Sequence, residues 1–564
     1  MLVINIVFTA AAAAGCIFAV IRRKETDRGR IFSSVYDILQ MRGFIVLMAL
    51  FALGVFVRVY KLDVLPIGLH FDETGAVYDA YSLANYGVDR YLNPYPVYLL
   101  NYGSGQSAMY SYVVMLSFKI FGYSIWAFRV PMALLNATSI LTGYALIKEM
   151  LGKRSAVFGA FLITICPYFM MSARFGLDCY LMMPAFTLAL WLFVKAVKTA
   201  KARWFIFCGA AFGITLYSYA LSYVILPVFL VLSVVYLFVV KSITVKNLVA
   251  MAVPLFLFAL PLLLMIMVNL GMIDEIRTSF ITIPKLMGYR GGEISMSNIG
   301  ASLEYIADVF TTDEGSFGSS DNFYVIYMMS LPFTALGLWI SVREAIRSIK
   351  EKRVELRALM VFVFVAVMAC MMLLARPTIY KANAVYIALI IFTIIGISRV
   401  CRSIKPAAFA TALMYFACFT AMCINYFAVD TVDTHAGFYD NTMEAYSIAR
   451  EMYPDRVIYL HMGGGATGYE WSYTYALLAD LESPYNFFDT MYRYGDTTNY
   501  GNNRFYLPLY LNEDGEPFYE IYPDSVYLIR YSASSETHQY LAAEFERRGF
   551  SYRVYEDYRI YYYD

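Results

Sequence analysis

The chain has 564 residues, of which 60% are hydrophobic and only 15% are charged. Soluble domains carry roughly 25% charged residues, so this composition excludes an ordinary soluble protein and requires most apolar side chains to face lipid or other helices. The net charge of +1 hides an asymmetry, since residues 428–564 hold 22 acidic and 9 basic residues, a net charge of −13. This segregation argues against a nucleic-acid partner and for a membrane protein whose two sides differ in charge.

Twelve apolar stretches are each long enough to cross the hydrocarbon core as a helix. We expect these spans near residues 3–21, 43–60, 124–147, 154–172, 180–197, 204–220, 221–240, 248–270, 323–341, 358–375, 383–399 and 406–427. The first is expected to be a span and not a signal peptide, because basic residues follow its apolar run and none precedes it. The predicted fold is a polytopic α-helical membrane protein with a C-terminal extracytoplasmic α/β domain.

Lys and Arg are concentrated in alternate loops, as in cytoplasmic loops of membrane proteins. The basic loops are 22–42, 148–154, 198–203, 241–246, 343–357 and 402–405. The opposite loop at 271–322 has eight acidic and three basic residues. Both termini are therefore expected outside the cytoplasm. All eight cysteines lie in or beside apolar segments, so the exported tail has no disulfide, which favours the plasma membrane of a bacterium or archaeon.

These patterns divide the chain into three regions. They are an extra N-terminal helix with a basic cytoplasmic loop (1–42), a membrane domain (43–427) that contains a long outer loop (61–123), and the acidic α/β domain (428–564). Within the outer loop, residues 108–121 are apolar but too short to span, so we expect an interfacial helix. In the tail we expect strands at 457–460, 526–529 and 553–563, and helices at 444–452, 470–481 and 536–548.

The sharpest local signal is Pro-Ile-Gly-Leu-His-Phe-Asp-Glu at residues 66–73, where the long outer loop begins. Adjacent carboxylates repel each other, so Asp72 or Glu73 is expected to have a partner or a chemical task such as proton transfer. The alternative is that both acids only stabilise the start of a helix over residues 76–85.

Basic side chains stand at other outer connections, namely Arg129, Arg174, Arg376 and Lys381. Ionisable groups at the rim of a helical bundle are costly unless they are paired or functional, and Arg matches phosphate oxygens well. Structural explanations also exist, since Arg174 could pair with Asp178 four residues later and Lys381 could reach the interface. Carboxylates and cations on one outer face suit a reaction on an anionic lipid substrate.

Four motifs in this order resemble those of the GT-C membrane glycosyltransferases, in the branch of the protein O-mannosyltransferases and lipid A aminoarabinose transferases. They are Pro-x-Gly-x-x-x-Asp-Glu (66–73), Gly-x-Asp (87–89), Phe-Gly-x-Ser-x-x-Ala-x-Arg-x-Pro (121–131) and Ser-x-Arg-x-x-x-Asp (172–178). The resemblance covers about residues 43–240 and continues as topology alone to 427.

The resemblance implies transfer of a hexosyl or pentosyl group from a polyprenyl-phosphate donor to an extracytoplasmic glycan, lipid or protein, with inversion at the anomeric carbon. It implies that Asp72 acts as a base or helps to hold a metal, with Glu73 as its partner. Asp178 matches the second outer acid of the family, and Arg129 matches an arginine that is important for activity.

Other residues are expected to bind the substrates. The donor phosphate is expected to contact Arg129, Arg174, Arg376 and Lys381, although the loop that carries the last two does not align with a family pattern. We expect His70 and Tyr102 to contact the sugar or acceptor. If the reaction depends on a metal, Mg²⁺ or Mn²⁺ is expected at Asp72 and Asp178.

Two other functions compete with this interpretation. A lipid or polysaccharide transporter would also have many spans, but its ionisable groups should lie near the bilayer midplane and not at the outer rim. A non-catalytic scaffold that presents the acidic tail to a partner would tolerate changes at Asp72 and Arg129.

Overall fold

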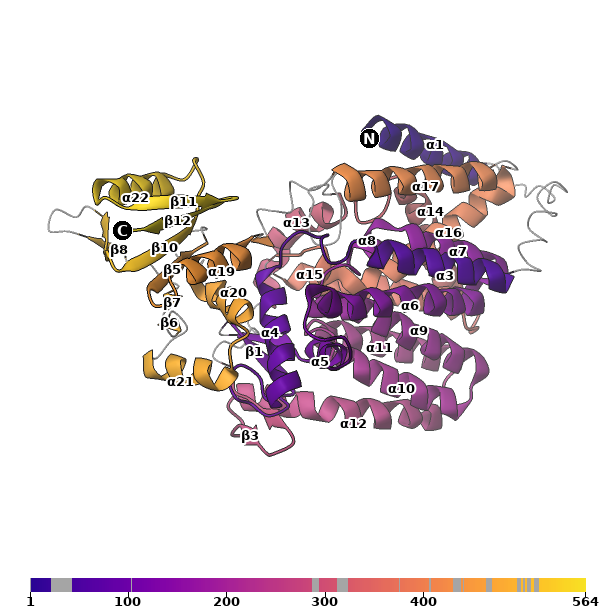
Figure 1. Ribbon diagram of the computed structural model, residues 1–564. Helices are drawn as coiled ribbons and strands as arrows, with labels where there is room; N and C mark the ends of the chain where they lie inside the picture. Colours follow the sequence, from indigo (N-terminus) through magenta and orange to yellow (C-terminus); the bar gives the residue numbers. More distant parts are fainter. Residues whose placement is uncertain are drawn as a thin grey trace.

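The computed structural model describes residues 2–21, 43–102, 104–286, 294–311, 323–374, 376–404, 407–429, 438–439, 441–462, 469–494, 499–500, 503–504, 509–511 and 517–564. A bundle of helices carries a smaller sheet-containing domain at one end (Figure 1). That domain is built from the C-terminal part of the chain, as predicted. The basic loop expected at 22–42 lies outside the described residues.

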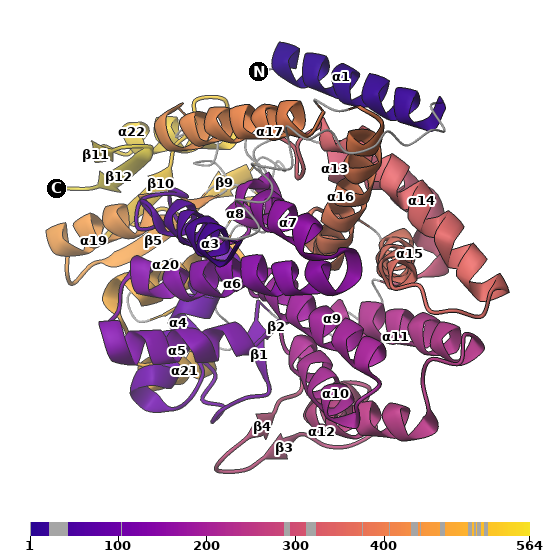
Figure 2. The same ribbon diagram turned by 90° about the vertical axis from the view of Figure 1, so that its right-hand side faces the viewer.

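Every expected span coincides with one helix or with two consecutive helices. In chain order these are α1 (Leu2–Ile21), α3 (Gly43–Val59), α6 (Ile125–Leu151), α7 (Lys153–Ile165), α8 (Pro167–Met171), α9 (Met182–Thr199), α10 (Ala202–Leu216), α11 (Ser222–Val239), α12 (Val245–Asn269), α14 (Ser330–Lys350), α15 (Arg357–Leu373), α16 (Tyr386–Ser403) and α17 (Ala407–Ile424). Helices α1 and α17 lie along one edge of the bundle, with α10 and α12 at the opposite edge (Figure 1 and Figure 2).

Two of the expected spans differ from the observed helices for visible reasons. The stretch 154–172 divides at Cys166 because Pro167 begins a new helix. Proline suits the first position of a helix, where a backbone N–H would have no intrahelical partner. The span expected at 323–341 begins as a helix only at Ser330, since the preceding segment is held in a turn whose Val325 carbonyl accepts the Tyr168 N–H at 3.0 Å.

Seven of the described helices are long and apolar enough to cross a membrane by length and composition. Shorter apolar helices include α3, α10 and α15. The chain is therefore a multi-pass membrane protein, and the count of twelve spans stays a prediction.

Glycines allow a close contact between helices α14 and α16. A Cβ added to Gly337 of α14 would collide with the Phe392 carbonyl of α16, and one added to Gly396 of α16 would collide with the Phe333 carbonyl of α14. Because neither residue has a side chain, the two backbones approach each other directly, as is typical of membrane helices.

The long outer loop folds into two helices and a hairpin. These are α4 (Phe71–Tyr86), β1 (Tyr98–Asn101), β2 (Ser104–Ser107) and α5 (Met109–Phe121). Helix α5 coincides with the expected interfacial helix, while α4 begins five residues earlier than expected. Gly87, with a φ of 74°, ends α4 and donates its N–H to the Leu83 carbonyl. Helix α4 stands between the bundle and the C-terminal domain (Figure 1).

Shorter elements connect the later helices. They are η1 (Asp178–Leu181), β3 (Ile276–Arg277), β4 (Thr282–Ile283), η3 (Met296–Asn298), α13 (Ile299–Thr311), η4 (Tyr380–Val385) and the π-helical turn η5 (Asn425–Val429).

The C-terminal domain has a six-stranded sheet with helices around it. Its elements are α19 (Thr442–Met452), β5 (Val457–His461), α20 (Tyr469–Asp480), α21 (Pro484–Tyr494), β6 (Asn499–Tyr500), β7 (Asn503–Arg504), β8 (Leu509–Leu511), β9 (Pro517–Tyr519), β10 (Ser525–Arg530), α22 (Glu536–Arg547), β11 (Ser551–Tyr555) and β12 (Tyr558–Tyr562).

The strand order in this sheet is β11-β12-β10-β5-β7-β6, with β5 parallel to both β10 and β7. The predicted helices and the first two predicted strands are confirmed. The single strand expected at 553–563 is wrong, because a turn with Glu556 at a φ of 51° reverses the chain and makes β11 and β12 an antiparallel hairpin.

Candidate active site

The two adjacent acids of the first motif have opposite environments. His70 is the N-cap of α4, and its Nδ1 accepts the Asp72 N–H at 3.2 Å. The Glu73 carboxylate closes a capping box by accepting the His70 N–H at 3.1 Å. The Asp72 side chain is 40% exposed, whereas the Glu73 side chain is fully buried. Helix capping therefore accounts for part of the role of Glu73, while the Asp72 carboxylate remains accessible at the surface of the molecule.

Glu73 forms a buried ion pair with Arg129. The Arg129 Nε lies 3.1 Å from Glu73 Oε1, and its Nη2 lies 2.9 Å from Oε2. The guanidinium also donates to the carbonyls of Pro66 and Gly68, at 2.7 Å each, while the Gly176 N–H donates to Glu73 Oε1 at 2.7 Å. The pair thus ties the first motif to α6 and to the connection at 172–178. Contact of Arg129 with a donor phosphate stays a prediction.

The motif at 121–131 explains why Arg129 lies there. Gly122 has a φ of 78°, and Ser124 caps α6 by accepting the Ala127 N–H at 3.1 Å. The helix therefore begins at Ile125 and carries Arg129 in its second turn, facing the buried Glu73.

Arg174 caps the end of α3 and does not form the ion pair with Asp178 that we considered. Its guanidinium is buried against carbonyl oxygens and one tyrosine hydroxyl: Val57 (2.9 Å), Arg58 (3.1 Å), Tyr60 (2.8 Å), Leu65 (3.0 Å) and Tyr426 (3.1 Å). The last carbonyls of a helix lack intrahelical partners, so these bonds fix the start of the outer loop. Contact of Arg174 with the donor phosphate also stays a prediction.

The β1–β2 hairpin connects Asp72 with Asp178. Asn101 Nδ2 lies 3.3 Å from Asp72 Oδ1, and the Ser107 N–H donates to Asp178 Oδ2 at 2.9 Å. Asp178 Oδ1 accepts the Cys179 N–H at 2.8 Å, and both acids lie within electrostatic range of the Cys179 side chain. The structure therefore brings the two predicted acids, which are distant in sequence, to one hairpin.

The late outer loop at 376–385 adjoins the same place. Asn383 Nδ2 donates to the Cys179 carbonyl at 2.6 Å, next to Asp178. Arg376 is exposed, and Lys381 is partly exposed with its Nζ 2.9 Å from the Arg376 carbonyl. Of the four predicted phosphate ligands, Arg376 and Lys381 are thus the two whose side chains reach the surface.

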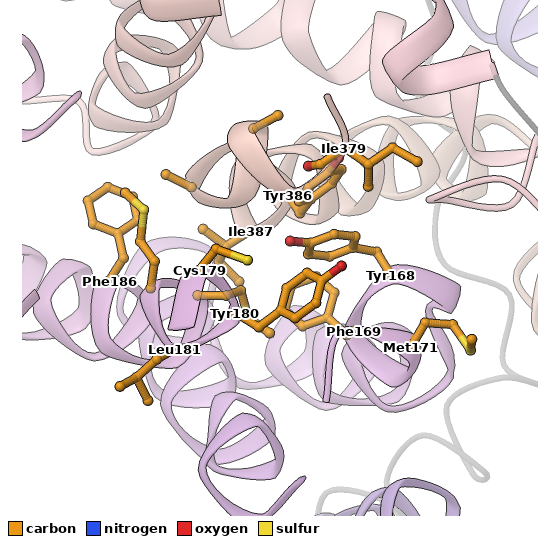
Figure 3. Packing of buried hydrophobic residues seen from close by; sticks show 14 of the residues in the cluster. Tyr168, Phe169, Met171, Cys179, Tyr180, Leu181, Phe186, Ile379, Tyr386 and Ile387 are labelled. Carbon is orange, nitrogen blue, oxygen red and sulfur yellow. The ribbon is translucent and has the colours of Figure 1, made fainter. Parts of the chain in front are cut away.

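Buried aromatic rings hold this late loop against the 172–178 connection. Tyr168 and Tyr386 stack with ring centroids 3.7 Å apart, and Tyr180 lies beside them (Figure 3). Tyr386 also donates its hydroxyl hydrogen to the Ile379 carbonyl at 3.0 Å. This packing fixes the position of the loop that carries Lys381.

His70 and Tyr102 both serve the start of α4 in this structure. Burial lowers the pKa of His70 to about 3, so the ring is neutral and its Nδ1 can accept the hydrogen bond from Asp72. Tyr102 donates its hydroxyl hydrogen to the Phe71 carbonyl at 2.6 Å. Their predicted contacts with the sugar or acceptor stay predictions.

Sequence reasoning missed a second buried ion pair in the outer loop. Arg90 Nη2 lies 2.7 Å from Asp79 Oδ2, and Arg90 Nε lies 3.0 Å from Asp79 Oδ1. The available signal was an acid set among apolar residues of a short helix, between Val77 and Ala80. Arg90, which immediately follows the Gly-x-Asp motif, was the second signal.

The chain is similar in sequence to known mannosyltransferase families. The family model described as dolichyl-phosphate-mannose-protein mannosyltransferase matches residues 106–268. YkcB of Bacillus subtilis, to which mannosyltransferase activity is ascribed by name, is 33% identical over 116 residues, which are 20% of this chain and 16% of that protein. The match therefore spans about a sixth of the length of this curated relative.

The chain is also similar to two crystal structures of ArnT from Cupriavidus metallidurans. The structure bound to undecaprenyl phosphate gives a TM-score of 0.55 at 14% identity, over 92% of this chain and 98% of ArnT. The apo structure gives 0.54 at 13% identity, over 93% and 98%. The chain therefore has the GT-C fold of membrane glycosyltransferases that its ordered motifs predicted.

Proposed function

We propose that the protein transfers a hexosyl or pentosyl group from a polyprenyl-phosphate donor to an acceptor hydroxyl outside the cytoplasm, with inversion at the anomeric carbon. The observation that carries this proposal is the exposed Asp72 carboxylate at the start of α4, next to a buried Glu73–Arg129 pair. The fold, the matched family and the lipid phosphate bound by ArnT support transfer chemistry over the transporter and scaffold alternatives.

In this proposal Asp72 is the general base. It accepts the proton of the acceptor hydroxyl as that oxygen bonds to the anomeric carbon, while the bond from this carbon to the phosphate oxygen breaks and polyprenyl phosphate leaves. A positioned base contributes typically 10²- to 10⁴-fold to such a step. A single displacement of this kind gives inversion.

The departing phosphate needs positive charge. Arg376 and Lys381 stand on the loop whose Asn383 bonds to Cys179, next to Asp178, and at least one of the two cations is proposed to contact the phosphate. Glu73 and Arg129 are proposed to act as positioning residues, because their pair is buried and fixes the start of α4. The polyprenyl tail would remain in the lipid.

A divalent cation, Mg²⁺ or Mn²⁺, is an optional part of the proposal. Among the described residues, no three His, Cys, Asp or Glu side chains gather as a metal site. Beside Asp72, however, Asn101 Oδ1 and Gln106 Oε1 are buried oxygens that accept no hydrogen bond from the described part of the chain. Amide and carboxylate oxygens suit these ions, so Asp72, Asn101 and Gln106, with Asp178, would hold a cation that neutralises the leaving phosphate.

The proposal places the protein in the plasma membrane of a bacterium or archaeon, with the site and both termini on the outer side. The alternation of basic and acidic loops supports this orientation. The acceptor would be a cell-envelope glycan, a lipid or a protein.

A transfer assay tests the proposal. Purified protein would be incubated with a panel of polyprenyl-phosphate sugars, with and without chelator, and released carrier would be measured. Asp72→Asn should lose at least 100-fold in turnover, about the contribution of a positioned base. Asp63→Asn, an exposed acid of the same loop, serves as the matched control and should stay active. Full activity of Asp72→Asn would refute the role of Asp72.

A further inference from the structure

Helix α20 of the C-terminal domain forms hydrogen bonds with the outer loop. Three consecutive residues of α20 bond to three parts of the loop. Thr474 Oγ1 lies 2.7 Å from Thr74 Oγ1, Tyr475 donates its hydroxyl hydrogen to the Leu69 carbonyl at 2.6 Å, and Tyr473 OH accepts from Arg90 Nη1 at 3.0 Å. Figure 1 shows α20 beside α4.

Leu69, three residues before Asp72, depends on the C-terminal domain at both of its backbone groups. Its carbonyl accepts from Tyr475, and its N–H donates to the Phe438 carbonyl at 2.9 Å. Leu69 is buried, so neither group would find water if those partners withdrew. The backbone that leads into the N-terminus of α4 is therefore fixed by residues more than 360 positions later in the chain.

A hydroxyl network continues this contact around the first turn of α4. Tyr102 OH lies 3.0 Å from Thr474 Oγ1 and donates to the Phe71 carbonyl at 2.6 Å. Thr74 also donates to the Phe71 carbonyl, at 2.7 Å. Phe71 and Thr74 flank Asp72 and Glu73. Because the hydroxyls of Tyr102 and Thr74 donate to the Phe71 carbonyl, the Thr474 hydroxyl can donate to one of these two and so supports the turn that carries both acids.

Phe438 adds an apolar contact that joins the segment leading into α4 to the connection at 172–178. Its ring lies 5.9 Å from the His70 ring and stacks on the Phe175 ring at 5.4 Å. Phe175 precedes Gly176, whose N–H binds Glu73. The C-terminal domain thus touches the segments on both sides of the Glu73 carboxylate.

We propose that Thr474 and Tyr475 are positioning residues of the transfer reaction, which hold the N-terminus of α4 and with it the Asp72 carboxylate. The C-terminal domain is then a structural part of the active site and not an independent module. This inference rests on the proposed function in taking Asp72 as the base. Small displacements of a reacting group lower turnover steeply, so removal of a single hydroxyl should measurably lower kcat.

Two variants test the inference, each lacking one hydroxyl, Tyr475→Phe and Thr474→Val. Thr474→Ser retains the hydroxyl. Tyr527→Phe is the control, because Tyr527 is a buried tyrosine of the same domain whose hydroxyl, among the described residues, bonds to the nearby Tyr522 and Ser525 and to no residue of the outer loop. Turnover and donor KM would be measured on the polyprenyl-phosphate sugar that the wild type uses. Hydrogen exchange of residues 69–76 and the thermal unfolding midpoint would be measured in parallel.

We expect Tyr475→Phe and Thr474→Val to lower kcat at least tenfold with donor KM within twofold, and to accelerate exchange at residues 69–76. Thr474→Ser and Tyr527→Phe should behave as wild type. The inference would be overturned if both hydroxyl-deleted variants kept the kcat and the hydrogen exchange of the wild type. It would also be overturned if kcat fell only in proportion to a lower unfolding midpoint, without faster exchange at residues 69–76.

Failure of the proposed function would be recognised separately. If the wild type uses no lipid-linked sugar, or if Asp72→Asn remains fully active, the role of Asp72 as base falls. The exchange measurement still decides whether α20 holds residues 69–76: faster exchange in the variants supports this contact, and unchanged exchange refutes it.

Discussion

Asp72 and Glu73 are neighbours in the chain, yet the Asp72 side chain is 40% exposed and the Glu73 side chain is fully buried against Arg129. Consecutive residues of a helix point in directions about 100° apart, so a pair of acids at a helix start can be divided between surface and core. This division is the basis of the proposal that Asp72 acts as the base and Glu73 as a positioning residue, and the following predictions test that proposal.

Glu73→Gln should destabilise the protein and lower turnover. The substitution leaves the Arg129 charge buried with its carboxylate partner removed, which costs about 3–5 kcal/mol in comparable buried pairs. Turnover should fall about 100-fold, since the Asp72 turn loses its anchor. The double variant Glu73→Gln/Arg129→Met should regain part of the unfolding midpoint without regaining turnover. Wild-type turnover in the single variant would contradict this account.

Gly75→Ala should lower activity through Asn101. A Cβ at this position would lie 2.5 Å from Asn101 Oδ1 and 2.7 Å from Arg90 Nη2. Because Asn101 contacts Asp72, its displacement should reduce turnover by roughly tenfold or more, as small shifts of reacting groups do. Gly300→Ala in α13 is the matched control, since a Cβ there meets nothing within 4 Å. Equal turnover in the two variants would argue against a role for the Asn101 contact.

Lys381→Ala and Arg376→Ala should weaken donor binding more than they slow the chemical step. A hydrogen bond to a charged group contributes about 1.5–3 kcal/mol, so loss of a phosphate contact should raise donor KM about 10- to 100-fold. Lys350→Ala, an exposed lysine at the end of α14, provides the control. The assignment fails if both variants keep the donor KM of the wild type, as steady-state kinetics would show.

Asp89 should make stability depend on pH. Burial, followed by the negative charge of Asp79, raises the pKa of Asp89 to about 7. The folded state therefore holds this proton more tightly than the unfolded chain, whose aspartate pKa is about 3.9. The resulting stability is complete below about pH 4 and is lost as pH rises through about 7.

The unfolding midpoint, measured in detergent from about pH 5 to 8, should fall with rising pH, and Asp89→Asn should flatten this dependence. The exposed Asp63→Asn variant controls for other titrating groups and should keep the wild-type slope. An unchanged slope in Asp89→Asn would show that another group titrates in this range.

Local patterns in the sequence predicted much of the fold. The helix positions of all the expected spans follow from runs of apolar residues, because hydrocarbon requires the backbone to bond within its own segment. In the tail, periodicity predicted α19, α20, α22, β5 and β10. It missed α21 and the short strands β6 to β9, and it took the hairpin of β11 and β12, which turns at Glu556, for one strand. The acids of the first motif stood out because they are adjacent at the start of the outer loop, and their expected roles came from the resemblance of the ordered motifs to a family.

Which charges are paired could not be predicted in this way. Arg174 was expected to contact the donor phosphate, with an ion pair to Asp178 as the structural alternative. In the structure its partners are carbonyls at or just beyond the end of α3, more than 100 residues earlier. The sequence likewise did not predict that Arg129 forms a buried ion pair with Glu73, while its contact with the donor phosphate stays a prediction. Burial decides both outcomes, since a charge removed from water takes whatever partner the packing brings to it.

The sequence alone determined that this is a membrane protein with a long loop that begins with two adjacent acids and with an acidic tail, since composition and hydrophobic periodicity are local properties. Only the tertiary structure decided that Asp72 is the exposed acid, and that Leu69 and Thr74 are held by Tyr475 and Thr474 some 400 positions away. The physical reason is that such hydrogen bonds form only after distant segments have packed, and no periodicity along the chain records them.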